Sequence, residues 1–402
     1  MPEMNPRHKR APCDFLGRLK AGLRTIANPS LYGAIWQLDQ GESTMNFASD
    51  NGAGVAPEIL KAIAASSLVN TPAYGADDYT ARAEAMLSEI FETRVVAFLV
   101  ATGTAANALA LSALAQPWSA VFCHEEAHIH DDECGAPEFF TGGAKLVGIA
   151  GWGGKITPDD LRETLGRFPS GLIKSVQPGA LSLSQATEAG TVYWQGEVGA
   201  LCDIAHSAGV GVHMDGARFA NAMVASQLSP ADMTWRAGVD ALSFGATKNG
   251  ALACEAVVFF DPARAMELAY RRKRAGHTLS KGRFLGAQME AYLKDGLWLR
   301  LAERANEAAH RLSKGLAAAP GLRLAWPTEA NEVFVVAPKA AVEAWRAAGA
   351  QFHEWSTRSL APEQMPGDGE RLLRLVTSFE TEQSEVDQLL GLYDGAYAGA
   401  AQ

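Results

Sequence analysis

The fold is decided by "VVAFLVATGTAANALALSAL", residues 95–114, in which an apolar, β-rich run passes through small residues directly into a helical pattern. Other apolar runs of strand length alternate with helical patterns, and they cover residues 120–123, 144–149, 180–184, 210–216, 241–246 and 256–260. This alternation predicts stacked βα units and a mostly parallel sheet. Because the runs are almost continuously apolar, we expect helices on both faces of that sheet.

The two ends of the chain differ from this pattern. Residues 1–45 include a basic stretch with apolar residues at helical intervals, and we expect an N-terminal arm or a poorly ordered extension there. Residues 46–290 are predicted to form a large domain. The remaining residues, 291–402, turn to Ala-rich helical segments with strands at 332–337 and 372–379, which predicts a smaller C-terminal α+β domain.

Composition and charge limit the function classes. The chain has 402 residues, of which 48% are hydrophobic and 20% charged, as in ordinary soluble globular proteins. A net charge of -10 disfavours a broad electrostatic contact with nucleic acid or an anionic membrane. No apolar run has the length of a membrane span, and the N-terminus lacks a signal-type hydrophobic segment. We therefore expect small-molecule chemistry.

The cysteines indicate a reducing compartment. They are odd in number, widely spaced and without a CxxC pair: Cys13, Cys123, Cys134, Cys202 and Cys254. This pattern predicts neither a disulfide framework nor a thiolate zinc site. A cytoplasmic location fits it.

The segment "CHEEAHIH", residues 123–130, contains the HExxH pattern of zinc proteases as His124, Glu125 and His128. Such a site needs both histidines on one well-formed helix and a third ligand downstream. Here the pattern directly follows the predicted strand 120–123, and the next residues supply neither a GxxH continuation nor a sustained helix. We therefore expect no metal at this segment.

Most polar residues of this segment are expected in a loop or at the surface, namely His124, His130, Asp131 and Asp132. His128 differs, because a histidine near the carboxyl end of a parallel strand lies where open α/β sheets bind ligands. We therefore expect His128 to contact a ligand.

The turn inside "VATGTAANAL", residues 100–109, places Thr102, Gly103 and Thr104 where the strand passes into the helix. Backbone N–H groups and hydroxyls at a helix N-terminus favour an anion such as a phosphate. Small residues at such a turn can also serve tight packing alone. This stretch by itself leaves both interpretations open.

Two later stretches carry an aspartate, an arginine and a lysine. In "VHMDGARFANA" (212–222), Asp215 at a strand exit can hold a protonated ring nitrogen, and Arg218 can reach a carboxylate or phosphate. In "LSFGATKNGAL" (242–252), Lys248 lies in a turn of small residues, where partial desolvation favours the neutral amine that makes a Schiff base. A solvated ion pair and a hydrated lysine are the alternatives.

Together these groups match the requirements of pyridoxal 5'-phosphate: a phosphate cradle, a ring contact, a pyridinium partner and a covalent anchor. In this the sequence resembles the threonine aldolase family of fold-type I pyridoxal-phosphate enzymes, and within it the bacterial low-specificity and phenylserine aldolases. The resemblance covers roughly residues 46 to 395. It rests on "SDNGAG" (49–54), "YGADDYTAR" (74–82), "TGTAANAL" (102–109), "HEEAHIHDDECGAPEFF" (124–140), "HMDGARFANA" (213–222), "DALSFGATKNG" (240–250) and "RRKRAGH" (271–277).

The resemblance implies an α/β fold of the aspartate aminotransferase type, with a mostly parallel seven-stranded sheet in the large domain and a small C-terminal α+β domain. It implies an aldolase that cleaves the Cα–Cβ bond of L-threonine, L-allo-threonine or phenylserine to glycine and an aldehyde, through an external aldimine and a glycine quinonoid. It also implies a homodimer or homotetramer with active sites at the subunit interface.

The resemblance further implies a role for each site residue. Lys248 carries the internal aldimine, Asp215 pairs with the pyridine nitrogen, and His128 stacks on the ring. Because a stacked imidazole can also lie near Cβ, we take His128 as the first candidate for the base that acts on the β-hydroxyl. The phosphate contacts are Thr102, Gly103, Thr104 and, across a subunit interface, Arg283. The substrate carboxylate contacts are Ser49, Arg218 and Arg374.

One departure leaves the base open. Many members of the family have a Thr-His pair after a strand, whereas this chain has "SLSQATEAG" (182–190), with Gln185 near the place of the histidine. His213 remains, two residues before Asp215, but can be structural only. The identity of the group that acts on the β-hydroxyl is therefore not predicted by the resemblance.

The sequence leaves three alternative functions open. Another fold-type I lyase or an aminotransferase would keep Lys248 and Asp215 but break a different bond. A zinc hydrolase would use His124 and His128 as ligands. A non-catalytic member would bind the cofactor without turnover.

Overall fold

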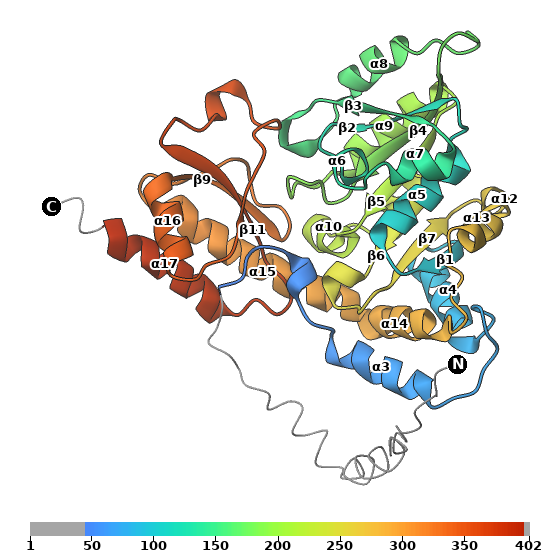
Figure 1. Cartoon of the computed structure of the whole chain (residues 1–402), viewed down its shortest axis with the longest axis horizontal. Coiled ribbons are helices and arrows are strands. Elements are labelled where there is room, and N and C mark those ends of the chain that lie inside the picture. Colours follow the sequence, from blue (N-terminus) through green and yellow to red (C-terminus); the bar gives the residue numbers. More distant parts are fainter. Residues whose placement is uncertain (1–44, 398–402) are drawn as a thin grey trace, which may run out of the picture. The chain divides into compact units, whose positions relative to one another are not determined.

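The computed structural model describes residues 45–397 (Figure 1). These residues belong to one compact unit that contains two sheets. The N-terminal arm expected within residues 1–45 lies outside the described residues, apart from Met45.

The larger sheet has seven strands and carries the predicted βα units. Its spatial order is β1 (Val96–Val100), β7 (Glu255–Phe259), β6 (Ala241–Gly245), β5 (Gly211–Gly216), β4 (Gln177–Ser184), β2 (Ser119–His124) and β3 (Lys145–Ile149). The pairings from β6 to β3 are parallel, and only β7 runs antiparallel to both of its neighbours. The mostly parallel seven-stranded sheet is therefore confirmed.

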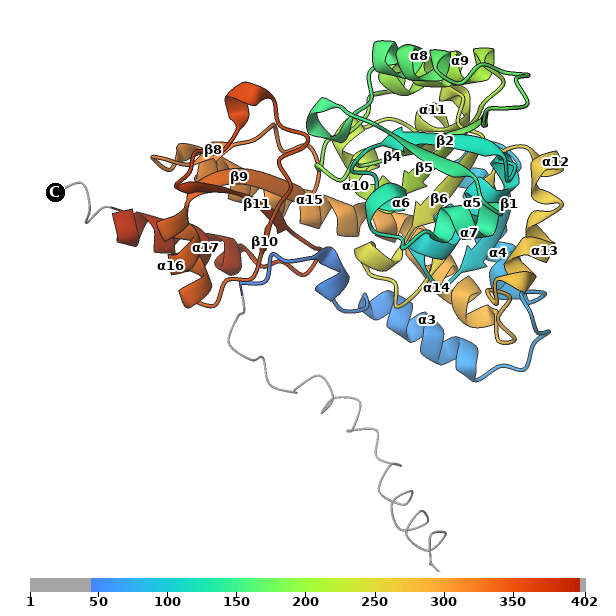
Figure 2. The same ribbon diagram turned by 45° about the horizontal axis from the view of Figure 1, so that its top comes forward.

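Helices cover both faces of this sheet (Figure 2), as the continuous apolar strands predict. On β7, Val257 and Phe259 pack in a core with helix α5, whereas Ala256 and Val258 enter the core formed with helices α4, α9, α10 and α14. The helices of this region are α3 (Pro57–Ser67), α4 (Asp78–Ile90), α5 (Gly103–Leu114), α6 (His128–Asp131), α7 (Ala136–Thr141), α8 (Pro158–Gly166), α9 (Gln195–Ser207), α10 (Phe219–Ser226), α11 (Pro230–Met233), α12 (Pro262–Ala265), α13 (Leu268–Arg274) and α14 (Arg283–Leu293).

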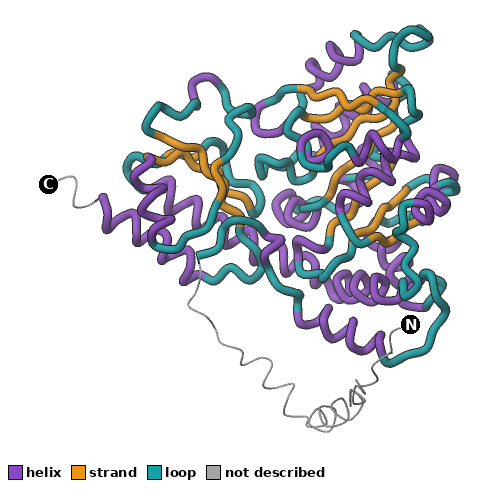
Figure 3. Tube along the Cα trace, in the orientation of Figure 1, coloured by secondary structure: helices purple, strands orange, loops and turns teal. Residues whose placement is uncertain are grey.

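The second sheet lies in the C-terminal part of the chain, and Figure 3 shows its strands gathered beside their own helices. Its antiparallel order is β10 (His353–Glu354), β11 (Glu370–Val376), β9 (Glu332–Pro338) and β8 (Arg323–Leu324). Its core includes residues from α15 (Leu297–Ala318), α16 (Lys339–Ala347) and α17 (Gln383–Tyr397). Strands β9 and β11 were predicted, whereas the two-residue strands β8 and β10 were not.

The long helix α15 joins the two regions, because it packs both on α10 of the larger region and on β9 of the smaller sheet. The division near residue 290 consequently stays a prediction. Single-turn 3₁₀ helices complete the described structure: η1 (Asp50–Gly52), η2 (Trp152–Gly154), η3 (Trp235–Ala237), η4 (Thr247–Asn249), η5 (Lys294–Gly296) and η6 (Pro362–Gln364). Within residues 45–397, no helix combines the length and the hydrophobicity needed to cross a membrane.

We expect Gly286→Ala to lower the free energy of unfolding by about 1–3 kcal/mol, as overpacking of a tight contact does. Gly286 on α14 faces α4, where a Cβ would lie 2.5 Å from the backbone nitrogen of Thr80. Gly199 on α9 is the matched control, because a Cβ there meets nothing within 4 Å, and alanine in an open helix position stabilises by about 0.5–1 kcal/mol. Denaturant unfolding of both variants measures the difference; equal effects at the two positions would contradict this account of the α4–α14 contact.

Candidate active site

A cavity of about 300 Å³ opens at the carboxyl ends of the parallel strands, where doubly wound sheets bind ligands. Most of the predicted site residues line it, namely Thr102, Gly103, Thr104, His128, Asp215, Arg218 and Lys248. Ser49, Arg283 and Arg374 are predicted site residues that do not line it. The local sequence patterns therefore converge on one cavity although they lie far apart in the chain.

One end of the cavity is the N-terminus of α5. Thr102 is the N-cap, and its Oγ1 accepts a hydrogen bond from the backbone N–H of Ala105 at 3.2 Å. A Cβ on Gly103 would meet no atom within 4 Å, so the first turn of the helix is open to a ligand. Backbone N–H groups in a first turn have no acceptor within their own helix, and the helix dipole favours an anion there.

Asp215 lies near the end of β5 and is held by two donors. Its Oδ1 accepts from the backbone N–H of Ala217 at 3.0 Å, and its Oδ2 accepts from Asn107 Nδ2 at 2.8 Å. The same Asn107 amide donates to Glu133 Oε1 at 2.9 Å. Only 7% of Asp215 is exposed, so its orientation is fixed by buried contacts from β5 and α5.

His128 begins α6 and is oriented by Glu133, since its Nδ1 lies 2.9 Å from Glu133 Oε1. The hydrogen bond with this carboxylate raises the pKa of His128 above its ordinary value. A chain of contacts therefore joins Asp215, Asn107, Glu133 and His128 along one wall of the cavity. The wall therefore holds one imidazole and two carboxylates, those of Asp215 and Glu133, in a fixed relation.

Lys248 lies in η4, directly after β6. Its Nζ makes no hydrogen bond or ion pair with any residue in the described range 45–397, and the side chain lines the cavity. Nearby Glu255 on β7 accepts from the backbone N–H of Ala246 at 2.8 Å, and burial raises the pKa of Glu255 to about 7. The amine is thus free to react with a carbonyl carbon.

These groups fit pyridoxal 5'-phosphate. An open helix N-terminus suits the phosphate, an unengaged lysine suits the aldehyde, and a fixed buried carboxylate suits the protonated ring nitrogen. All three face one cavity. The small residues at 102–104 leave this end of the cavity open, and their phosphate role stays a prediction.

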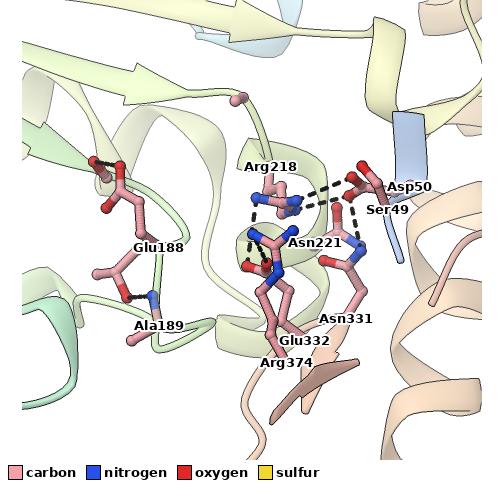
Figure 4. Close-up of polar contacts among 12 residues, drawn as sticks. Ser49, Asp50, Glu188, Ala189, Arg218, Asn221, Asn331, Glu332 and Arg374 are labelled. Atoms are coloured by element: carbon pink, nitrogen blue, oxygen red, sulfur yellow. Dashed lines mark hydrogen bonds and ion pairs between the residues drawn. The ribbon is translucent and has the colours of Figure 1, made fainter. Parts of the chain in front are cut away.

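Beside the cavity, two arginines and two acidic residues form a buried cluster (Figure 4). Arg218 makes a bidentate contact with Asp50, from Nε to Oδ2 at 2.8 Å and from Nη2 to Oδ1 at 2.9 Å. Glu332 lies on the other side of Arg218, with Oε2 3.4 Å from Nη1. Burial acts to raise the pKa of Asp50, but the charges of Arg218 and Lys248 outweigh it and hold that pKa below its ordinary value.

Arg374 is the less engaged arginine of this cluster. Its guanidinium stacks on the Trp355 ring at 4.0 Å, its Nη2 donates to the Ala48 carbonyl at 3.3 Å, and its nearest carboxylate oxygen belongs to Glu332 at 4.0 Å. Its Nε has no acceptor among the described residues. Arg374 therefore retains donors for an added carboxylate, whereas the fork of Arg218 is already occupied by Asp50.

The remaining predicted contacts are more distant. Ser49 is the N-cap of η1, and its Oγ accepts from the backbone N–H of Asn51 at 3.2 Å, beside the arginine cluster. Arg283 donates from Nε to the Ser66 carbonyl at 3.0 Å. Its predicted role requires a second subunit and stays a prediction.

The HExxH segment does not form a zinc-protease helix. His124 ends β2 and His128 begins α6, so the two imidazoles lie on different elements. The expectation that His124 lies in a loop or at the surface was wrong, because it is buried and its Nε2 lies 3.1 Å from the Gly151 carbonyl oxygen. His130, Asp131 and Asp132 are exposed, as expected. In the described part of the chain no three His, Cys, Asp or Glu side chains are grouped to hold a metal ion.

Gln185 and His213 are both structural. The Gln185 amide is fully buried, donates to the Tyr193 carbonyl at 2.8 Å and accepts from the Tyr193 N–H at 3.0 Å. His213 lies between Ser182 and Ser243 on the neighbouring strands, at 2.9 Å from each hydroxyl, and burial lowers its pKa to about 4. Neither residue replaces the histidine that the resemblance led us to seek.

Sequence reasoning missed the acidic and amide groups that orient the predicted residues: Asp50, Asn107, Glu133, Glu188, Glu255, Asn331 and Glu332. Asn107 left one signal, since it is the only amide in the apolar pattern of residues 103–114. The others reach the site from segments with no local motif, and their contacts depend on the tertiary fold.

Comparisons with known proteins agree with this geometry. The family model of the beta-eliminating lyases matches residues 46–340. A low specificity L-threonine aldolase from a Pseudomonas species is 41% identical over 348 residues, which is 87% of this chain and 96% of that protein. The low specificity L-threonine aldolase of Pseudomonas aeruginosa matches with the same identity and coverage.

Solved structures give the same result. A Leishmania major threonine aldolase is 28% identical with a TM-score of 0.80, over 87% of this chain and 99% of its own. A Sphingomonas wittichii serine palmitoyltransferase, at 16% identity and a TM-score of 0.64 over 96% of this chain and 97% of its own, shares the fold alone. Fold and cavity thus define the class of fold-type I pyridoxal-phosphate proteins. More particularly, the chain belongs to the beta-eliminating lyase family, among the threonine aldolases.

Proposed function

We propose that this chain is a pyridoxal-phosphate-dependent aldehyde-lyase, a threonine aldolase that cleaves the Cα–Cβ bond of L-3-hydroxy-α-amino acids to glycine and an aldehyde. The observation that carries the proposal is the unengaged lysine, Lys248, in one cavity with the fixed carboxylate Asp215 and the open N-terminus of α5. The 41% identity to low specificity L-threonine aldolases supports the choice of bond.

The cofactor would be held at three places. Thr102, Gly103 and Thr104 would receive the phosphate at the N-terminus of α5, Lys248 would bind the aldehyde carbon, and Asp215 would face the ring nitrogen. When bound, the cofactor supplies an electron sink for the bond that breaks. The role proposed for Asp215 is to keep the ring nitrogen protonated, and that for His128 is to pack against the ring.

The substrate carboxylate would be bound chiefly by Arg374. Its Nε has no acceptor within residues 45–397, and its guanidinium stacks on the Trp355 ring. Arg218 would contribute its positive charge, because its Nε and Nη2 donors are already bound to the Asp50 carboxylate. Ser49, close to this cluster, would add a hydroxyl. Fixing the carboxylate at this edge of the cavity orients the scissile bond, which selects cleavage over loss of the α-proton.

The direct test is incubation of the purified protein with L-threonine, L-allo-threonine and L-phenylserine, followed by quantification of glycine and aldehyde. We expect equal amounts of glycine and aldehyde from at least one of them, and no keto acid. Keto acid without glycine would instead indicate an aminotransferase. Cofactor binding without any product would indicate a non-catalytic member of the fold.

We further propose a homodimer or homotetramer with a shared active site. Tyr74 and Tyr270 are 56% and 77% exposed, and the loop of Tyr74 pairs with the Ser280 carbonyl close to Arg283. Tyrosine and other aromatic residues are enriched in protein–protein interfaces relative to the rest of the surface. Light scattering coupled to gel filtration measures the oligomeric state. The described cysteines are free thiols, which supports the proposed cytoplasmic location.

A further inference from the structure

The group that accepts the β-hydroxyl proton is not supplied by the residues that sequence reasoning singled out. Gln185 is turned into the protein interior, where its amide pairs with Tyr193. The His128 Nδ1–H donates to Glu133 Oε1, and this contact raises the pKa of His128. Because the His128 ring is already engaged by Glu133 and is proposed to pack against the cofactor ring, a base is sought among the other groups that line the cavity.

Glu188 is placed to be that base. It lies in the loop after β4, lines the cavity, and receives hydrogen bonds at Oε1 from the His128 backbone N–H and the Ser184 hydroxyl, both at 2.8 Å. Figure 4 shows Glu188 on its loop, apart from the arginine cluster. Its second oxygen, Oε2, is buried and has no hydrogen-bond partner within residues 45–397.

No Lys, Arg or His side chain within residues 45–397 forms an ion pair with the Glu188 carboxylate. Burial, and then the negative charge of Asp215, raise the pKa of Glu188 to about 7. The titratable groups that face it come from several elements and are Cys123, His128, Tyr193, Asp215 and Arg218. Its carboxyl group can therefore take up and release a proton near neutral pH, as efficient general bases do.

The other carboxylates of the cavity are committed elsewhere. Asp215 is held by Asn107 and the Ala217 N–H and faces the proposed ring site. Glu133 is joined to the His128 ring and to Asn107 through the same oxygen. Glu255 accepts from the Ala246 N–H in the turn that carries Lys248. Glu133 also has a buried oxygen without a partner, Oε2, but its Oε1 already orients the His128 ring. Among the cavity carboxylates of residues 45–397, Glu188 combines a free buried oxygen with contacts that fix no other side chain that the proposed function assigns.

From this geometry we propose that Glu188 is a catalytic residue that exchanges a proton with the β-hydroxyl of the 3-hydroxy amino acid, an inference that rests on the proposed function. In cleavage, the Glu188 carboxylate takes the hydroxyl proton, and the electron pair of the O–H bond becomes the second C–O bond of the aldehyde. The electron pair of the Cα–Cβ bond stays with the glycine fragment, whose Cα then takes up a proton from solvent to give glycine. The proton leaves Glu188 to solvent after the aldehyde departs.

Glu188→Gln tests this assignment, because it keeps the shape of the side chain and removes only its ability to accept the proton. We expect kcat for L-threonine cleavage to fall by about 10²–10⁴, the usual contribution of a general base. Cofactor content, the dissociation constant for glycine and the exchange of the glycine α-proton with deuterated water are expected to stay within about threefold of wild type, since none of them involves a β-hydroxyl. Glu163→Gln, on the exposed face of α8, is the matched control.

Ser184→Ala gives an independent test that needs no loss of the carboxylate. Removing a donor that favours the ionised form is expected to raise the pKa of Glu188 further, so the acidic limb of kcat/KM should move to higher pH. In Glu188→Gln this limb should disappear. If Glu188 had only a structural role, the acidic limb of kcat/KM would stay at the same pH in both variants.

A third readout is independent of turnover. Because burial raises the pKa of Glu188 from 4.5 to about 7, its contribution to stability is complete below pH 4.5 and is lost as the pH rises through 7. Glu188→Gln should therefore gain thermal stability relative to wild type between about pH 5 and about pH 8.

The outcomes separate this inference from the proposed function. If wild type releases no glycine, the proposed function fails. If wild type releases glycine and Glu188→Gln keeps kcat within about threefold, the base assignment is overturned. Parallel losses of glycine binding, α-proton exchange and cleavage in Glu188→Gln would also overturn it, because they would indicate a structural role or a role at Cα.

Discussion

Lys248→Ala is expected to lower steady turnover of L-threonine by roughly 10³-fold or more, since removal of a covalent nucleophile eliminates the path that it opens. The Lys248 amine is the one that lines the cavity, and no described residue pairs with it. Without it the cofactor loses its covalent anchor, and the amine that releases the product from the cofactor is absent. Both effects act on every turnover.

The measurement is twofold. Steady-state release of glycine gives the rate, and borohydride reduction followed by peptide mapping locates the pyridoxyl label. We expect the label on Lys248 in wild type and none in the variant. Lys294→Ala removes an exposed lysine of η5 and is expected to leave rate and label unchanged. A label on another lysine, or full activity of Lys248→Ala, would refute the anchor assignment.

The larger sheet could be predicted because its strands are marked locally. Each buried strand of this sheet is a short apolar run between turn residues. Because helices cover both faces, such a run is visible in the sequence without an alternating apolar–polar pattern and without knowledge of the tertiary contacts. Strands β8 and β10 have two residues each and carry no periodic signal. Their existence depends on pairing with β9 and β11, which only the folded chain provides.

The site residues likewise fall into those that a local sequence pattern marks and those that only the tertiary fold brings into place. Lys248 and the turn at 102–104 could be predicted, because a strand followed by small residues and a functional group is a local pattern. The partners of these groups could not. Asp50 meets Arg218 across 168 positions of the chain, and Asn107 meets Asp215 across 108. The resemblance named Arg218 as a carboxylate contact, but it could not reveal that an internal carboxylate already holds its guanidinium fork.

The structure also shows which acidic residues balance the charges of the two arginines, Arg218 and Arg374. The buried cluster holds two guanidinium groups and two acidic residues, Asp50 and Glu332, so its charges are nearly balanced before any substrate arrives. Burial raises the pKa of Glu332 above its ordinary value. Binding of a substrate carboxylate near Arg374 adds negative charge, which would raise that pKa further. Substrate binding is therefore expected to favour the neutral form of Glu332.

Asp215→Asn is expected to lower kcat by about 10²–10³, because a neutral amide cannot stabilise a protonated ring nitrogen in a buried site as a carboxylate does. The change preserves the side-chain shape. Its oxygen can still accept from one of the two present donors, Asn107 Nδ2 or the Ala217 N–H, so the local fold should persist. What the variant loses is the negative charge at a position that is 7% exposed.

Steady-state kinetics and the absorbance of the bound cofactor between about pH 6 and about pH 9 measure the effect, because the protonation of the ring and its adduct determines both. Asn107→Ala serves as the graded comparison: it keeps the Asp215 carboxylate but removes one of its donors, and we expect about a tenfold loss. Asp232→Asn, a surface aspartate that pairs with Arg236, should change neither measurement. If Asp215→Asn kept kcat within about threefold of wild type, the carboxylate would not be the partner of the ring nitrogen, and the orientation of the cofactor in the cavity would have to be reversed or rebuilt around Glu133 or Glu255.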